Sequence, residues 1–213
     1  MSTFPGSPRL IKGALIGVDL MNPLASIVVF QYNPDTMSRR LEPRGAGGDG
    51  DHGEAFRLAG PPKETITVSI EIDATDQLEQ AQPLAVATGI SPTLAALEMM
   101  LYPKSAVVIA NTILSAIGTV EIIPAEGPMI LFVWGPTRVL PVRVTSLNIT
   151  EEAYDTLLNP TRAKAEISLS VLSYNDLKIL TPGNALFLAH QITKEIMATT
   201  NVFNSVQNLG GAF

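Results

Sequence analysis

The sequence predicts a mainly β protein, folded as an antiparallel barrel or sandwich, and three observations lead to this class. Hydropathy alternates with a period of two over several segments, most of which are apolar on one face only. The 213 residues are enough for one principal domain with a substantial core. The chain has no cysteine, so neither disulfides nor thiolate metal sites are expected to hold it together.

Seven segments are expected to form strands. The clearest are residues 65–73 and 163–171, in which Ile, Val, Leu and Ala alternate with polar side chains. Residues 140–144 alternate as well, and the apolar phase then slips, which predicts a bulge near Thr145 or Ser146. Four shorter strands are expected at residues 14–18, 27–32, 36–41 and 128–133. One-sided burial favours antiparallel pairing, because the strands of parallel sheets are apolar on both faces.

A helix and a long loop interrupt this strand pattern. Residues 92–101 are expected to be helical, with Ser91 as the N-cap, Pro92 at the first helical position and Pro103 as the stop. Residues 43–62 are rich in Gly, Asp and Pro, a composition that cannot pack a core, so we expect a flexible loop there.

A second helix is expected at about residues 184–198. Leu188, Ile192 and Ile196 recur four residues apart, which places them on one helix face that needs a partner surface. The uncharged run at residues 105–120 is expected either to be buried or to face a partner. It is shorter than the ~20 apolar residues of a membrane span, so we expect no membrane insertion.

Catalytic and metal-binding motifs are missing from the sequence. No G-x-S-x-G or Walker pattern occurs, the acidic residues 49–54 do not fit a calcium loop, and His52 and His190 lack ligands at metal spacing. His190 is expected to be a half-exposed helix residue. The net charge of -6 argues against nucleic-acid binding. We therefore expect no enzymatic activity, no cofactor and no metal.

Several short motifs share their order with one known family. The run Phe30-Gln31-Tyr32-Asn33-Pro34 resembles the F-x-[FY]-N-P strand end that opens the contractile injection system tube-type domain. Residues 65–73 resemble the family's strand with an acidic end, and residues 131–135 resemble its F-x-W-G turn. Residues 142–151 with 162–172 resemble its closing hairpin. The resemblance covers about residues 10–175.

The resemblance implies a small antiparallel β-barrel of the phage tail tube type over residues 10–176, with one or two peripheral helices. It also implies a baseplate ring, as a hexamer of this chain, that joins the spike or hub protein to the inner tube protein beside other baseplate proteins. Assembly would be cytoplasmic, within a phage tail-like particle that is released or docked on a membrane. Many family members carry a peptidoglycan-binding LysM module, for which residues 177–213 are too few. We expect that segment to be a helix and tail that dock on a neighbouring subunit.

The motif residues also have a direct physical interpretation. Asn33 and Pro34 form a turn signal that would join two adjacent strands tightly. Trp134 is a large apolar anchor, and Gly135 supplies backbone angles that other residues avoid. With Phe30, these residues form the candidate structural motif. Two other functions stay open, namely an inner tube protomer that forms stacked rings and a soluble β-barrel that binds a small ligand.

Overall fold

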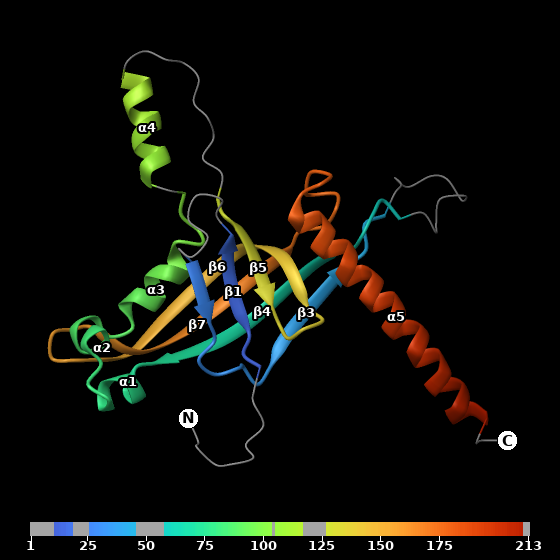
Figure 1. Cartoon of the computed structure of the whole chain (residues 1–213), viewed down its shortest axis with the longest axis horizontal. Coiled ribbons are helices and arrows are strands. Elements are labelled where there is room, and N and C mark those ends of the chain that lie inside the picture. The colour runs from blue at the N-terminus through green and yellow to red at the C-terminus, as the bar shows by residue number, and fades with distance from the viewer. Residues whose placement is uncertain (1–10, 19–25, 46–57, 104, 117–126, 211–213) are drawn as a thin grey trace.

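A seven-stranded antiparallel sheet forms the centre of the computed structural model (Figure 1). The structure describes residues 11–18, 26–45, 58–103, 105–116 and 127–210. The strands lie in the order β2-β1-β5-β6-β7-β4-β3. Their bounds are β1 Ala14–Val18, β2 Ser26–Val29, β3 Met37–Glu42, β4 Lys63–Asp73, β5 Met129–Val133, β6 Val139–Tyr154 and β7 Pro160–Val171.

The predicted mainly β class and all seven predicted strands are confirmed. In β4 and β7 the apolar side chains point inward together, because register pairs Ile66 with Leu169 and Val68 with Ile167. The predicted bulge in β6 is also confirmed, since the ladder with β7 shifts between Val144 and Ser146.

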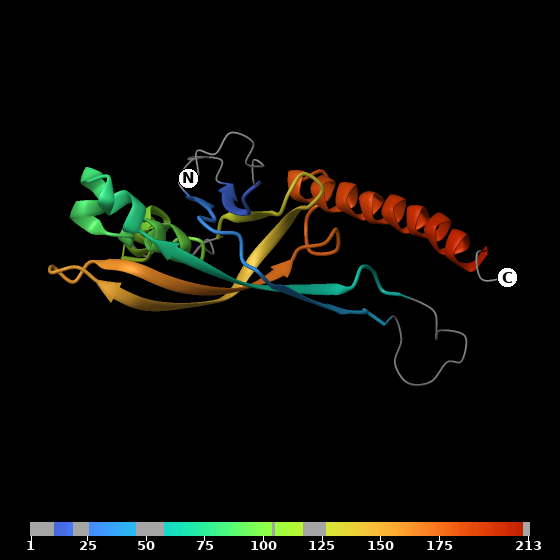
Figure 2. The same cartoon turned by 90° about the horizontal axis from the view of Figure 1, so that it is seen from below.

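The predicted barrel is wrong, because the sheet is open. Among the described residues β2 and β3 are its two edges, and each pairs with one neighbour only. The first part of β6 pairs with β5 and the rest with β7, so one long strand joins two halves of the sheet. Apolar side chains from both halves share a single core, and the sheet folds over this core without closing (Figure 2).

Within the described residues five helices accompany the sheet, where one or two were expected. They are α1 Thr75–Glu79, α2 Pro83–Thr88, α3 Ser91–Glu98, α4 Ser105–Ala116 and α5 Pro182–Gly210. The first two are too short to show a helical period in the sequence. The third is the predicted helix, but the predicted cap is wrong, since Ile90 is the N-cap and no side chain caps it. Its Leu94 and Leu97 join the core.

α5 begins earlier and ends later than predicted. The hydroxyl of Thr181 accepts a hydrogen bond of 3.4 Å from the Asn184 N–H, and Pro182 follows the capping threonine. The helix packs on the sheet at its start and then extends beyond it (Figure 1). Of the loop predicted at 43–62, residues 46–57 lie outside the described residues, and Gly45 pairs with Leu58 across that stretch. The division at residue 176 stays a prediction.

Candidate functional site

The predicted motif residues Phe30 and Trp134 meet at the margin of the core, where Phe30 is buried and Trp134 is half-buried. Their ring centroids lie 6.4 Å apart, and Trp134 also stacks on Phe132 at 5.8 Å. The Phe30 N–H donates to the Gly13 carbonyl at 2.8 Å. A Cβ atom at Gly13 would lie 2.7 Å from Phe30 and 2.9 Å from Trp134, so only glycine fits beside these rings. This cluster holds the start of β1 against the end of β2.

Asn33 does not form the tight turn that the sequence predicted. Its side chain accepts a hydrogen bond from the Gly13 N–H at 2.9 Å and donates one to the Ile11 carbonyl at 2.8 Å. The strands on either side of Asn33 and the half-buried Pro34 are the two opposite edges of the sheet. Asn33 therefore fixes the connection between β2 and β3 to the residues before β1. The turn signal in the sequence did not indicate this long-range contact.

Gly135 occupies the predicted hairpin. The Trp134 N–H donates to the Arg138 carbonyl at 2.8 Å, and β5 pairs directly with β6. Gly135 has φ 79°, in the left-handed region that favours glycine. The predicted unusual backbone angles are confirmed.

α5 docks on the sheet through a face that the sequence analysis did not select. Phe187 contacts Tyr174 edge to face, with ring centroids 5.9 Å apart, and belongs to the core. His190 is 8% exposed, so its predicted half-exposed position is wrong. Its Nδ1 lies 3.2 Å from the Thr137 carbonyl. Because a carbonyl only accepts, Nδ1 carries the proton and Nε2 is an acceptor, which is buried and has no hydrogen-bond partner among the described residues. Burial lowers the pKa of His190.

A buried carboxylate lies beside this docking face. The Glu64 side chain is 4% exposed, and Arg39 of β3 contacts its Oε1 through Nη2 at 2.6 Å. Lys194 of α5 contacts Oε2 at 3.2 Å. Burial by itself would raise the pKa of Glu64, but the hydrogen bonds and charges of Arg39 and Lys194 outweigh it and hold that pKa below its usual value. Glu64 therefore joins β3, β4 and α5.

A pocket of about 430 Å³ opens to solvent between α5 and the β3–β4 edge. Leu41, Leu58 and Tyr174 give it apolar walls, and Glu64 and His190 are among its polar lining residues. Sequence reasoning missed this site. The period of two in β4 places Glu64 on the same inward face as Ile66, and that signal would have found it.

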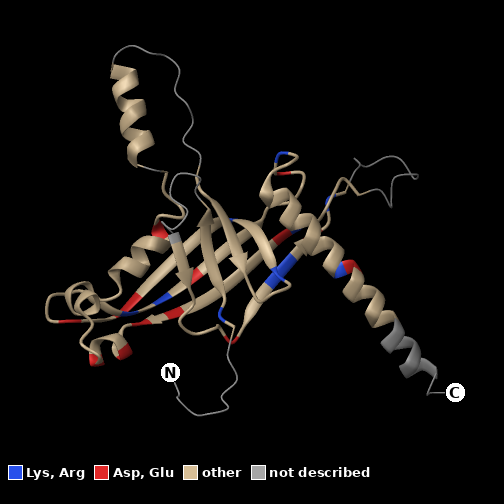
Figure 3. Cartoon of the chain, in the orientation of Figure 1, with Lys and Arg blue, Asp and Glu red and all other residues tan. Residues whose placement is uncertain are grey.

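The predicted interface residues lie on the outward face of α5. Leu188, Ile192 and Ile196 are 41%, 55% and 61% exposed, and the helix packs on the sheet through the opposite side. Ala185 and Ala189 lie on the same outward face and are exposed too. An apolar, uncharged stripe therefore follows the first part of α5 (Figure 3).

α4 is the second exposed apolar surface. None of its residues is buried, and none is charged (Figure 3). Ile109 is 58% and Ile113 55% exposed. The helix projects away from the sheet beyond α3 (Figure 1). The uncharged run predicted to be buried or to face a partner is thus not buried over residues 105–116, and its remainder lies outside the described residues.

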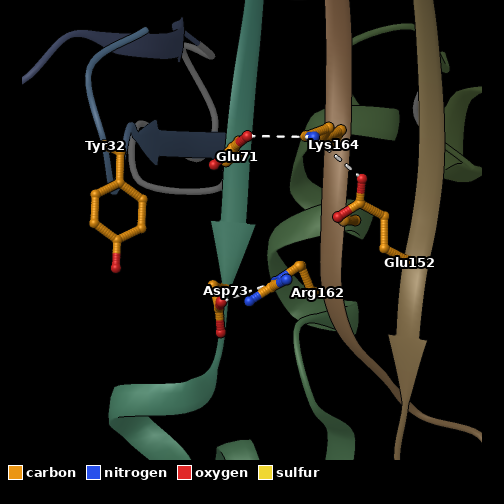
Figure 4. A pocket seen from close by; sticks show the side chains of 7 residues that line it. Tyr32, Glu71, Asp73, Glu152, Arg162 and Lys164 are labelled. Atoms are coloured by element: carbon orange, nitrogen blue, oxygen red, sulfur yellow. Dashed lines mark hydrogen bonds and ion pairs between the residues drawn. The ribbon is translucent and has the colours of Figure 1, made fainter.

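A charged pocket of about 340 Å³ lies on strands β4, β6 and β7 (Figure 4). Lys164 lies between Glu71 and Glu152, with N–O distances of 3.5 and 3.3 Å, and Arg162 contacts Asp73 at 3.1 Å. The Thr75 hydroxyl and N–H donate to Asp73 and are the main reason that its pKa is lowered. Each of these five charged side chains has a partner of opposite sign, and the three carboxylates exceed the two cations by one charge.

The described residues hold no grouping of three or more His, Asp or Glu side chains that is able to bind a metal ion. None of the helices within the described ranges has both the length and the hydropathy of a membrane span.

Comparisons with known proteins give weak likenesses. Neither models of protein families nor curated protein sequences match the chain. Two similar solved chains come from the virion of a native gene transfer agent particle and from the tail of an empty particle of that kind. Each is 12% identical, with 75% of this chain and 90% of the other covered and a TM-score of 0.29. A TM-score this low establishes neither a shared fold nor a shared function.

Proposed function

We propose that this chain is a structural, non-enzymatic subunit of a contractile injection system, which forms a ring adaptor between the spike or hub and the inner tube. Its partners are further copies of itself, the spike or hub protein, the inner tube protein and other baseplate proteins. The order of the sequence motifs from Phe30 to Leu172 supports the class of particle. The hexameric ring and the place within a tail-like particle rest on the same resemblance.

The observation that carries a role in assembly is the uncovered apolar surface. The outward face of α5 exposes Leu188, Ile192 and Ile196, and α4 exposes Ile109 and Ile113. Soluble monomers seldom expose contiguous apolar patches of this kind, whereas subunits cover them with a neighbour.

The open sheet supports the same proposal. Its edges β2 and β3 leave backbone groups unpaired within the described chain. An edge strand is a template for pairing with another chain, and two different edges allow head-to-tail contacts that close into a ring. Residues Ile27 and Val29 of β2 are 43% and 54% exposed, and they would be covered in such a contact.

The test is the copy number of the chain in purified tail-like particles, measured by quantitative mass spectrometry against the inner tube protein. The adaptor predicts one ring of this chain per particle, in a defined ratio to the spike. An inner tube protomer, which the same unpaired edges would also serve, predicts many rings per particle. Absence of the chain from such particles would overturn both. A monomer that binds a small apolar ligand in the 430 Å³ pocket would then be the reading to pursue.

A further inference from the structure

Two helices of this chain carry the same pattern of small and large apolar residues. In α4 the pattern is Ala106, Ile109, Ala110 and Ile113, and in the outward face of α5 it is Ala185, Leu188, Ala189 and Ile192. Both follow the spacing i, i+3, i+4, i+7, so the four side chains of each helix lie on one face. Every one of these eight residues is exposed.

The two faces match in shape and in charge. On each face two alanines, four residues apart, lie beside two large apolar residues, also four residues apart. Two such faces pack closely when the large side chains of one helix fit against the alanines of the other. α4 has 12 residues, about 18 Å of helix, and residues 185–196 of α5 span the same length. None of the eight residues on these two faces is charged, so a contact between the faces would bury no charge from them (Figure 3).

The two faces do not meet within one molecule. α4 follows α3, which packs on β2, one edge of the sheet. α5 crosses β4 at the Lys194–Glu64 contact, and Glu64 pairs with Leu41 of β3, the other edge. Figures 1 and 2 both show α4 and α5 well separated. Because α3, which precedes α4, packs on the β2 edge and α5 lies near the β3 edge, a head-to-tail joint between these edges would bring α4 of one copy towards α5 of the next.

We propose that the outward face of α5 is covered by α4 of a second copy of this chain. The contact is heterologous, so every copy gives one helix and receives the other around the ring. The proposal rests on the proposed ring, and it adds the pair of surfaces that joins its subunits. It also explains why a short helix projects from the sheet with none of its residues buried by the described part of the chain, since isolated helices of this length are marginal in water.

Disulfide trapping tests the pairing directly, because the chain has no cysteine of its own. A mixture of the Ile109→Cys and Ile192→Cys proteins is expected to form linked dimers under mild oxidation. Neither protein alone is expected to link to itself. Thr112→Cys is the matched control on the polar side of α4, and its mixture with Ile192→Cys is expected to stay unlinked. Self-linking of either single variant as the main product would overturn the proposal, because it shows like-with-like pairing.

Charge rescue gives a second, independent readout. Ile109→Glu and Leu188→Lys each place an unpaired charge in the joint and are expected to weaken self-association about tenfold or more. A chain that carries both substitutions has one of each sign at every joint and is expected to regain most of the assembly. Unchanged assembly of both single variants would sink this inference and leave the proposed function intact. Failure of the wild-type chain both to self-associate and to enter tail-like particles would remove the two together.

Discussion

Arg39→Met is expected to destabilise the fold strongly, because it leaves the buried carboxylate of Glu64 with half of its partners. Arg39 binds Oε1 through both Nε and Nη2, at 2.7 and 2.6 Å, and the Glu64 side chain is 4% exposed. Removal of one partner from a buried ion pair costs about 3–5 kcal/mol. Lys194 still binds the second oxygen, so the lower end of that range, about 3 kcal/mol, is the expected loss in the free energy of unfolding.

The chain offers a matched control one residue further along β3. Arg40 pairs with Glu42 at 2.9 Å, and the two side chains are 80% and 51% exposed. Exposed ion pairs contribute about 0–1 kcal/mol, so Arg40→Met is expected to be nearly silent. The assay is urea denaturation followed by circular dichroism, supported by thermal melts, in which 3 kcal/mol corresponds to about 6–12 °C for a chain of this size.

The double variant Arg39→Met, Glu64→Met separates lost packing from a stranded charge. With the carboxylate gone no anion is left buried at this position, and the side chain of Lys194 is 42% exposed and therefore hydrated. The double variant is expected to be clearly more stable than Arg39→Met alone. Equal losses for Arg39→Met and Arg40→Met, or a double variant no better than the single one, would refute the reasoning.

Three further outcomes are expected. The pKa of His190 is lowered by burial, so the unfolded chain takes up its proton first and stability falls as the pH drops below about 6.5; His190→Gln should remove that decline in denaturation curves at pH 7.5 and 5.5. Gly13→Ala should cost about 1–3 kcal/mol by overpacking against the two rings, while Gly127→Ala, with open space at its Cβ, should leave the melting temperature unchanged. Truncation after Asp176 removes a core aromatic residue and should prevent a cooperative melt, whereas truncation after Thr200 keeps the packed turns of α5 and should preserve it.

The strands were predictable because their information is local. Each strand that has one face in the core carries the period of two in its own sequence, as residues 65–73 and 163–171 do. The bulge near Thr145 was predictable for the same reason, since it appears as a slip in that period. Local patterns were therefore enough to predict which side chains of each strand face the core, without knowledge of how the strands pair.

The open topology was not predictable in this way. The turn signal of Asn33 and Pro34 indicates a change of chain direction, but it does not say how far the chain travels before the next strand pairs. Here the chain crosses from one edge of the sheet to the other, and Asn33 bonds to residues 20 and 22 positions earlier. A turn signal of two residues does not indicate hydrogen-bond partners that lie so far away in the sequence.

The cluster of Glu64, Arg39 and Lys194 was not predicted from the sequence, for a related reason. Its own inward position follows from the phase of β4, but its two cations are 25 and 130 residues away in the chain. A buried carboxylate is stable only where the fold supplies such cations. The sequence therefore shows that an acidic residue occupies an inward position of β4, but it does not show which cations pair with it.

α5 shows how a correct pattern leads to an incomplete interpretation. Leu188, Ile192 and Ile196 form the clearest stripe in the sequence, and an amphipathic helix normally packs through its clearest stripe. The structure instead packs the helix through Phe187 and His190, whose spacing defines a second, less regular face. α5 thus has two apolar faces, and the fold of its own chain buries only the one that contains Phe187. The more regular face, with Leu188, Ile192 and Ile196, stays exposed, and this exposed face is the observation on which the proposed helix pairing rests.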